Sequence, residues 1–187
     1  MTPAGEDAWG GLCISESLPF EFRPAGAPPT PLVMAEANAT NLQTLIVDAT
    51  LGEARRGAES SELDANRQSD LERIESKVDV LLGMVARLAA GARPPGPPRR
   101  LRLFAQGLEW EASAPEPPAG QAGIVHLQVN PAFPQRLVLP GAVAGVRRGA
   151  DGDWVQFRFE GIGDRVVAML ERLIFRRHRR QVAGTHG

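Results

Sequence analysis

The 187-residue chain contains one cysteine, Cys13, so no disulfide framework can form within it. It also lacks any apolar run approaching the roughly 18 residues that a membrane-spanning helix needs. The N-terminal stretch has neither a basic start nor a continuous apolar core, and therefore predicts no secretory signal. We expect a cytoplasmic protein with no membrane span.

The chain also lacks a strong net charge. Its 21 basic and 22 acidic residues leave a formal charge of -1, which argues against a general nucleic-acid coat and against a strongly basic membrane-surface protein. The two signs are unevenly distributed, however. Residues 1–98 carry 14 acidic and 8 basic side chains, whereas residues 99–187 carry 8 acidic and 13 basic ones. This asymmetry indicates two modules.

Motifs for catalysis or metal binding are absent as well. The sequence has no metal-ligand spacing of cysteines and histidines, no zinc-protease motif, no phosphate loop and no nucleophile elbow. Gly161-Ile-Gly163 lacks the third glycine of a dinucleotide fingerprint and predicts a strand-to-helix turn. Asp151 and Asp153 flank a glycine and predict a tight hairpin turn rather than a metal site. We expect a protein that is not an enzyme and that uses no metal or cofactor.

The clearest periodic signal lies in the first half of the chain. Apolar residues recur there with alternating spacings of three and four, which is the repeat of a coiled-coil seam. Two apolar side chains beside the seam widen the stripe and favour three or four strands. The predicted oligomerisation residues are Leu71, Ile74, Val78, Leu81, Leu82, Met84, Val85 and Leu88. We expect a homo-oligomer, with four subunits as the favoured number; a helix packed on its own globular domain is the alternative.

Shifts in composition divide the chain into five consecutive segments. They are an extended, partly mobile N-terminal segment, a helical heptad region, a Pro/Gly linker, a strand-rich domain with a final helix, and a flexible tail, at residues 1–32, 33–90, 91–98, 99–181 and 182–187. In the first segment, the apolar island Leu18–Phe22 either docks as a short edge strand or stays mobile. In the second, Leu42 and Leu45 have the helical spacing that would let a first helix pack beside the heptad helix.

Beyond the linker, the pattern changes from helical to strand-like. Several short alternating runs, separated by turns such as Asp151-Gly152, predict a small antiparallel barrel. A helix starting at Asp164 carries an apolar face that is expected to close one end of this barrel. The residues of that face are Val166, Met169, Leu170, Leu173 and Ile174. The predicted fold class is therefore α+β, with an N-terminal helical coiled-coil region followed by a small antiparallel β-barrel and a C-terminal helix.

Two basic clusters remain as candidate contact sites. Arg99, Arg100 and Arg102 lie where the linker meets the first predicted strand. The second cluster lies near the end of the last helix, where cations also complement the helix dipole. A solvated helix end, a docking face for an acidic protein surface and a nucleic-acid contact all stay open for it. Its candidate partner-binding residues are Arg176, Arg177, Arg179 and Arg180.

Residues 99–180 resemble a PilZ domain. The likeness rests on the arginine-flanked first strand, on the order of elements of a six-stranded barrel, and on the closing helix that ends in Leu173–Arg180. PilZ domains are bacterial signalling barrels, many of which bind cyclic di-GMP. The preceding heptad region is similar to an atypical branch of the family, whose members form tetramers through a four-stranded coiled coil. The resemblance implies a cyclic di-GMP-linked pathway such as type IV pilus function, motility or virulence.

Family members that bind cyclic di-GMP carry an RxxxR motif before the first strand and a [DN]xSxxG motif farther on. Arginine forks suit such a ligand because they hold phosphates and guanine edges through paired hydrogen bonds. In this chain, the residue four positions after Arg99 is Leu103, and the same spacing from Arg100 also reaches an apolar residue. Asn130 begins the nearest match to the second motif, but alanine stands where the motif has serine. Both motifs are absent.

We therefore expect a non-enzymatic signalling adaptor that assembles through its helices and does not itself bind cyclic di-GMP. It would act through an unidentified protein partner in signalling or pilus machinery. The alternative is a cyclic di-GMP receptor that binds outside the family's motifs, through Arg99, Arg100 and Arg102. A nucleic-acid binder is the third hypothesis, although no aromatic ladder accompanies the basic clusters.

Overall fold

The computed structural model describes residues 9, 11–59, 78, 85, 96–130, 133 and 135–184. The elements in this part of the chain are β1 (Ile14–Pro24), α1 (Pro31–Glu59), β2 (Pro98–Leu103), β3 (Gly107–Glu111), β4 (Ala122–Leu127), β5 (Leu137–Gly149), β6 (Gly152–Phe159) and α3 (Asp164–Gly184). The predicted α+β class is confirmed. No described helix combines the length and the apolar character that a bilayer crossing requires.

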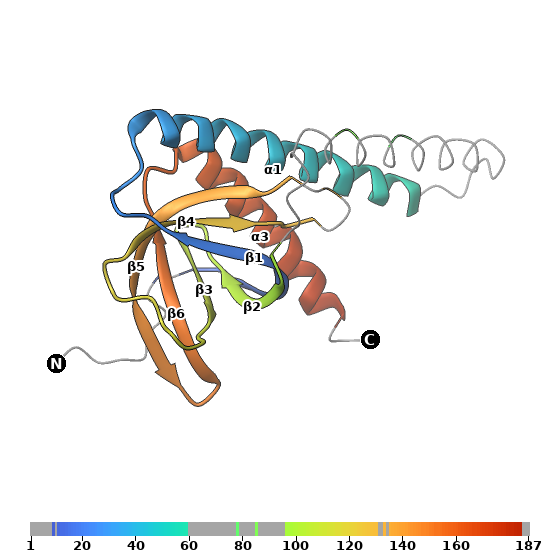
Figure 1. The fold of residues 1–187 in the computed structure, drawn as a ribbon. Coiled ribbons are helices and arrows are strands. Elements are labelled where there is room, and N and C mark those ends of the chain that lie inside the picture. The colour runs from blue at the N-terminus through green and yellow to red at the C-terminus, as the bar shows by residue number, and fades with distance from the viewer. Residues whose placement is uncertain are drawn as a thin grey trace.

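The strands form a closed antiparallel barrel in the order β1-β2-β3-β6-β5-β4 (Figure 1). Strand β1 closes it, because residues 14–19 pair with β2 and residues 20–24 pair with β4. The structure therefore differs from the segment boundaries expected above, which placed residues 1–32 outside the barrel. The island Leu18–Phe22 is paired along both of its neighbours and is not an edge strand. A sheet closes into a barrel only when a strand pairs with both of its edges. Here that strand is β1, which precedes the helical region.

Large apolar side chains fill the barrel. Four aromatic rings meet inside it, with neighbouring ring centroids between 5.0 and 6.1 Å apart. They belong to Phe20, Phe22, Trp110 and Phe157. Rings at these separations attract one another beyond the burial of their apolar surface. Residues from the start of the chain and from its second half therefore share one core.

Helix α3 packs against the open end of this core, as its apolar face predicts. Val166, Leu170, Leu173 and Ile174 are each at most 2% exposed, and Met169 packs partly buried beside them. Burying an aliphatic side chain of this size stabilises a fold by roughly 1.5–3 kcal/mol. The last helix is thus part of the barrel domain rather than an appendage.

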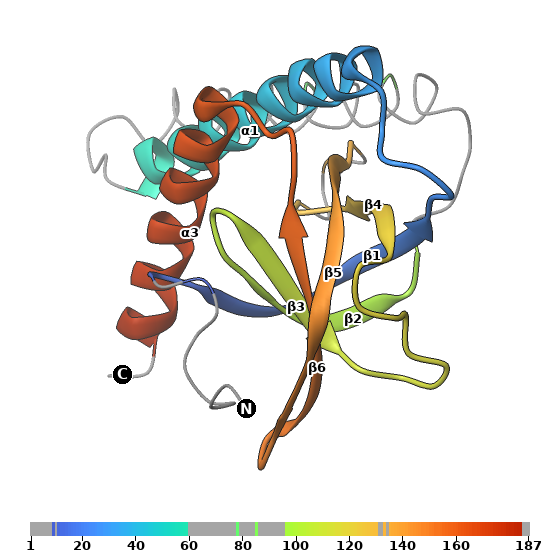
Figure 2. The same cartoon turned by 90° about the vertical axis from the view of Figure 1, so that its left-hand side faces the viewer.

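Helix α1 crosses the barrel (Figures 1 and 2), and polar side chains make part of its contact with it. The side-chain amide of Asn41 donates to the carbonyl oxygen of Val138 at 2.7 Å, and its Oδ1 accepts from the Val138 N–H at 2.6 Å. Val138 lies near the start of β5, whereas the pairing of β5 with β6 begins only at Gly141. Asn41 therefore completes the backbone hydrogen bonds of β5 at the point where β6 has ended.

Asn38 makes the same two-way contact one turn earlier, with the connection between β6 and α3. Its amide donates to the Gly161 carbonyl oxygen at 2.8 Å, and its Oδ1 accepts from the Gly163 N–H at 2.9 Å. Gly161 has a φ of 69°, and a Cβ there would lie 1.9 Å from the sulfur of Met34. This left-handed φ favours glycine, and a side chain here would also displace Met34. The predicted strand-to-helix turn is confirmed, and α1 holds it in place.

The β5–β6 turn and the start of β2 lie close to the positions predicted from sequence, whereas the end of α3 lies three residues beyond the predicted one. The β5–β6 turn lies at Asp151-Gly152, where Gly152 has a φ of 113°. Strand β2 begins at Pro98, the last residue of the predicted linker, which is paired with Pro19. Helix α3 continues to Gly184, past the boundary expected at residue 181, because no helix breaker precedes that glycine.

The predicted oligomerisation residues fall mainly outside the described residues, so the heptad interpretation stays a prediction. Val78 and Val85 are described; both are helical, and their side chains are 46% and 61% exposed. The others, which the structure does not describe, are Leu71, Ile74, Leu81, Leu82, Met84 and Leu88.

The apolar face of the first helix packs on the barrel, and its expected pairing with the heptad helix lies outside the described residues. Leu45 is 1% exposed and belongs to the barrel core, and Leu42 packs partly buried against the same core. These leucines therefore anchor α1 on the barrel. Helical spacing predicts which side of a helix is buried, but it does not identify the neighbouring element.

Candidate functional site

The three arginines at the end of the linker do not share a face of β2. Arg99 lies two residues before the core residue Leu101, on the same inner face of β2, and its guanidinium lies over the Phe20 ring, 5.8 Å from the ring centroid. Arg100 and Arg102 project from the opposite, outer face of the strand. The structure thus brings together only two of the three residues that the receptor alternative requires.

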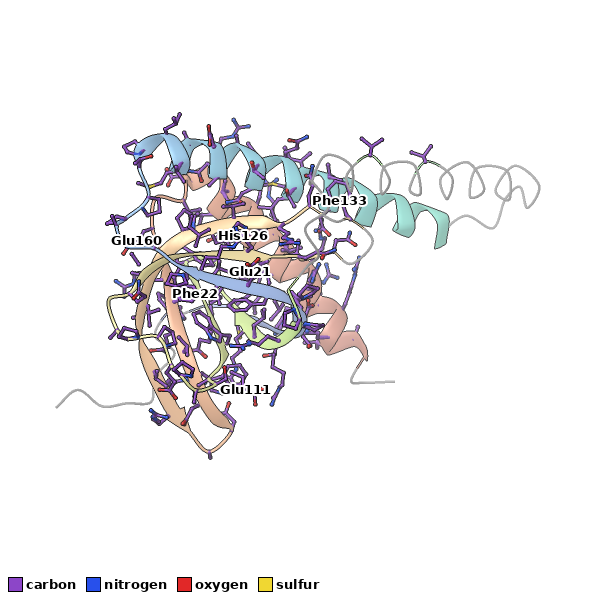
Figure 3. All side chains as sticks on the ribbon, viewed as in Figure 1. Glu21, Phe22, Glu111, His126, Phe133 and Glu160 are labelled. Carbon is purple, nitrogen blue, oxygen red and sulfur yellow. The ribbon has the colours of Figure 1, made fainter. Side chains whose placement is uncertain are left out.

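On the outer face, Arg100 and Arg102 lie over the indole of Trp154. Their guanidinium carbons are 5.6 and 4.6 Å from its ring centroid, which is within cation–π distance. Trp154 is only 2% exposed. Arg100 also lies 3.7 Å from Glu111, which is at the end of the barrel farthest from α1 (Figure 3). The arginines cover the indole and leave no open ring face for a ligand base to stack on.

Glu109 holds this outer face together. Its carboxylate is 3% exposed and lies 3.6 Å from Arg102 and 3.2 Å from Arg147. It also accepts a hydrogen bond of 2.8 Å from the side-chain amide of Gln156. A buried carboxylate needs partners of this kind, because an unpaired charge is strongly disfavoured away from water. Arg102 and Arg147 are therefore structural cations of the barrel.

Asp151, in the hairpin turn, pairs with the same arginines. It lies 2.5 Å from Arg102 and 3.5 Å from Arg147. Desolvation tends to raise the pKa of Asp151, but a hydrogen bond within its own residue and the charges of Arg102 and Arg147 outweigh it. The pKa of Asp151 therefore lies below its ordinary value, and this carboxylate contributes to stability in its charged form.

The second basic cluster divides into two pairs. Arg176 donates to Asp48 of α1 at 2.6 Å. Arg177 lies 2.5 Å from Glu16 of β1 and donates to the carbonyl oxygen of Val129. Both side chains, which the sequence suggested as partner-binding, thus join α3 to other elements of the same chain.

Arg179 and Arg180 remain exposed, as does Arg172 two turns before Arg179. Among the side chains that the structure describes, which leave out those of residues 50–59, none of these three has an acidic side chain at ion-pair distance. Arg179 lies over the exposed ring of Phe175, 5.9 Å from its centroid. The last turn of α3 contains no basic residue, so the helix dipole explains little of the cluster, because its effect fades within one turn.

A groove of about 550 Å³ lies between α1 and α3, and these arginines line it. Apolar side chains from both helices line it, and arginines of α3 lie along one side. The lining residues are Leu45, Ala49, Met169, Arg172, Leu173, Phe175, Arg176, Arg179, Arg180 and Ala183. Three of the four predicted partner-binding residues are in the set, and Arg172 joins them. A four-residue spacing from Arg172 through Arg176 to Arg180 is the sequence signal for Arg172.

The residues that fix this groove were not singled out from the sequence. They form a polar stripe on α1 with helical spacing, at Asn38, Asn41, Thr44 and Asp48. Thr44 contacts Gln135 at 3.3 Å, and Asp48 accepts a hydrogen bond of 3.2 Å from Asn130. Their recurrence every three or four positions places these polar residues on one face of the helix, but that spacing alone does not distinguish a buried polar face from a solvated one. Among the described residues, no three potential metal ligands lie together.

Comparison with known proteins adds the family. Residues 46–186 match the family model described as "Atypical PilZ domain, cyclic di-GMP receptor". The chain belongs to the atypical PilZ domain family. The resemblance noted from sequence is thereby confirmed, and with it a place in PilZ-type cyclic di-GMP signalling. The family description names a receptor domain and no catalytic activity. The matched range begins within α1 and does not include β1.

One solved structure is similar over most of both chains. It is a pathogenic protein from Xanthomonas campestris, a tetrameric PilZ domain self-assembled via a helical bundle, with 26% sequence identity and a TM-score of 0.61. The alignment covers 91% of this chain and 90% of that chain. No curated protein sequence matches this atypical PilZ protein.

Asp151→Asn is expected to lower the urea-unfolding midpoint at neutral pH, with a difference that disappears as the pH falls. Because the pKa of Asp151 is below its ordinary value of 3.8 in the folded state, its charge stabilises the fold above that value. This stability is lost as the pH falls through the folded-state pKa. The urea-unfolding midpoints of the unmodified protein and of the variant, compared between about pH 7 and pH 3, measure this loss of stability. Glu171→Gln, on the exposed face of α3, is the control, and a difference that persists unchanged at low pH would contradict the assignment.

Proposed function

We propose that this atypical PilZ protein is a non-enzymatic, cytoplasmic adaptor of cyclic di-GMP-linked signalling. It assembles into a homo-oligomer, does not itself bind cyclic di-GMP, and acts by contacting a protein partner. Type IV pilus function, motility or virulence is the pathway that we propose. The observation that carries the proposal is the engagement of Arg102 and Arg147 with the buried carboxylate of Glu109.

This engagement opposes nucleotide binding at the first cluster. To hold a phosphate, Arg102 would have to leave Asp151 and Glu109, which lie 2.5 and 3.6 Å away. The buried carboxylate of Glu109 would then keep one cation, Arg147, in place of two, which is unfavourable because a buried charge is stabilised by its ion-pair partners. Arg99 contributes little, since it lies on the other face of β2. The absence of both ligand-binding sequence motifs supports the same conclusion.

Oligomerisation has two supports. The similar solved structure is a tetramer held by a helical bundle, and the exposed valines Val78 and Val85 have the spacing of a coiled-coil seam. An oligomer would present several barrels at once. Multivalent presentation raises the apparent affinity for a partner without any new contact.

A second candidate function is that of a cyclic di-GMP receptor, and the family description favours it. In this case Arg100 would be the leading ligand-binding residue, because it is the most exposed of the three arginines near β2. Its ion pair with Glu111, at 3.7 Å, is on the surface and is easily exchanged for a phosphate contact.

Calorimetric titration of the full-length protein with cyclic di-GMP is expected to give no saturable heat at high micromolar ligand. The physical reason is that the arginines of the barrel already pair with carboxylates of their own chain. A saturable heat would contradict the adaptor proposal. If Arg100→Glu removed that heat while Arg165→Glu on the exposed surface of α3 kept it, the receptor function would replace the adaptor function.

Replacing both Val78 and Leu81 with Asp is expected to convert the oligomer into monomers that keep a folded barrel. Two charges in a coiled-coil seam cannot be buried between helices without a large desolvation penalty. The molar mass measured by light scattering should fall from about four times the 20.1 kDa subunit mass to the mass of one subunit. Leu32→Asp, on the exposed side of α1, is the control. An unchanged mass would show that the heptads form an intramolecular face.

A further inference from the structure

We propose that the groove between α1 and α3 binds an acidic amphipathic helix of a partner protein. This inference rests on the adaptor function proposed above, and it names the chemistry of the partner. The expected helix presents an apolar stripe to the floor of the groove and carboxylates to Arg172, Arg179 and Arg180. Its binding requires no nucleotide.

The shape of the groove suits a third helix. Helix α3 starts beneath α1 and diverges from it toward its own C-terminus, so the two helices form a V (Figures 1 and 2). Leu45 and Ala49 line the α1 side, and Met169 and Leu173 line the α3 side. The ion pair between Arg176 and Asp48, at 2.6 Å, ties the two helices together. Amphipathic helices bind in apolar grooves of this kind through side chains three and four positions apart.

The charge of the groove determines which helix it fits. Arg172, Arg179 and Arg180 lie along one stripe of α3, and the described side chains, which do not include those of residues 50–59, supply no acidic partner to them. Asp48, an acidic neighbour of this stripe, already pairs with Arg176. Guanidinium groups form strong paired hydrogen bonds with carboxylates and with phosphates, and the apolar lining of this groove favours a carboxylate carried on an amphipathic helix. Arg172 and Arg179 are two turns apart, about 10 Å along the axis, so two carboxylates at the same spacing on a partner helix would reach both.

The groove fits a protein segment better than a nucleotide or a membrane. Its floor is made of aliphatic side chains, which offer no hydrogen bonds to a base or a ribose. A bilayer surface is flat on this scale and cannot enter a V between two helices. Phe175, which lines the groove with its side chain 57% exposed, is the kind of aromatic anchor that dominates protein interfaces.

The test uses a synthetic peptide as the probe and the full-length protein as the receptor. The peptide has about 18 residues, or five helical turns, with leucines every three and four positions and glutamates two turns apart beside them. A scrambled peptide of identical composition keeps the charge but loses the stripe. Binding is followed by the fluorescence anisotropy of labelled peptides, in physiological salt so that non-specific attraction is screened.

The proposal predicts saturable binding of the striped peptide and at least tenfold weaker binding to Arg172→Glu, the size of effect expected when a charged pair at an interface is broken. Arg165→Glu is the matched control, because Arg165 is exposed on the same helix and does not line the groove. It should bind the striped peptide as the unmodified protein does. Both variants lie on the surface of α3 and carry the same change of charge.

Several results would overturn the proposal. Equal binding of the scrambled peptide would show charge attraction without docking. No binding of either peptide would mean that no partner helix enters the groove, including the case in which another segment of this chain occupies it. Retention on anionic phospholipid vesicles that Arg172→Glu abolishes, without peptide binding, would assign the surface to a membrane. These outcomes are independent of the cyclic di-GMP titration, so either proposal can fail alone.

Discussion

The backbone of β5 near Val138 imposes the requirement on which the rest of the structure depends. Strand β6 ends before it reaches this part of β5, which leaves the N–H and carbonyl groups of Val138 without a strand partner on that side. Asn41 supplies both hydrogen bonds from α1. Buried backbone groups must be paired, so the barrel reaches a satisfied state only with α1 in place. A helix from the predicted oligomerisation region is thus a part of the signalling barrel.

This arrangement links the two modules that the charge distribution suggested. Asp48 extends the polar contacts of α1 to Arg176 of α3, and α3 in turn packs on the barrel core. A rotation of α1 would therefore disturb the barrel, α3 and the groove together. The arginines of the two basic clusters likewise fall into two groups. Arginines such as Arg102 and Arg177 form ion pairs within the chain, whereas the exposed arginines of α3 line one groove.

The sequence predicts well what depends on local pattern. Alternation and turn chemistry indicate the antiparallel barrel, the turn at Gly152 and the closing helix with Leu170 inside. The role of β1 is missed, because its pairing with β2 and β4 joins residues far apart in the chain, and no local pattern records this. The stripe from Asn38 to Asp48 is missed for another reason. Sequence rules read polar helix residues as solvated, whereas here they replace a missing strand. The pairing of Arg176 with Asp48 likewise depends on the tertiary fold.

Hydrogen exchange at the Val138 amide tests the central claim most directly. In the unmodified protein this amide should be protected, and Asn41→Ala should raise its exchange rate by at least about tenfold while the core of β4 at Val125 stays protected. The free energy of unfolding at a fixed subunit concentration should fall by about 1–3 kcal/mol, the usual penalty for an unsatisfied buried group. Gln43→Ala, on the exposed side of α1, should change neither quantity. Unchanged protection of Val138 in Asn41→Ala would contradict the account, because the Val138 backbone would then be protected without the hydrogen bonds of Asn41.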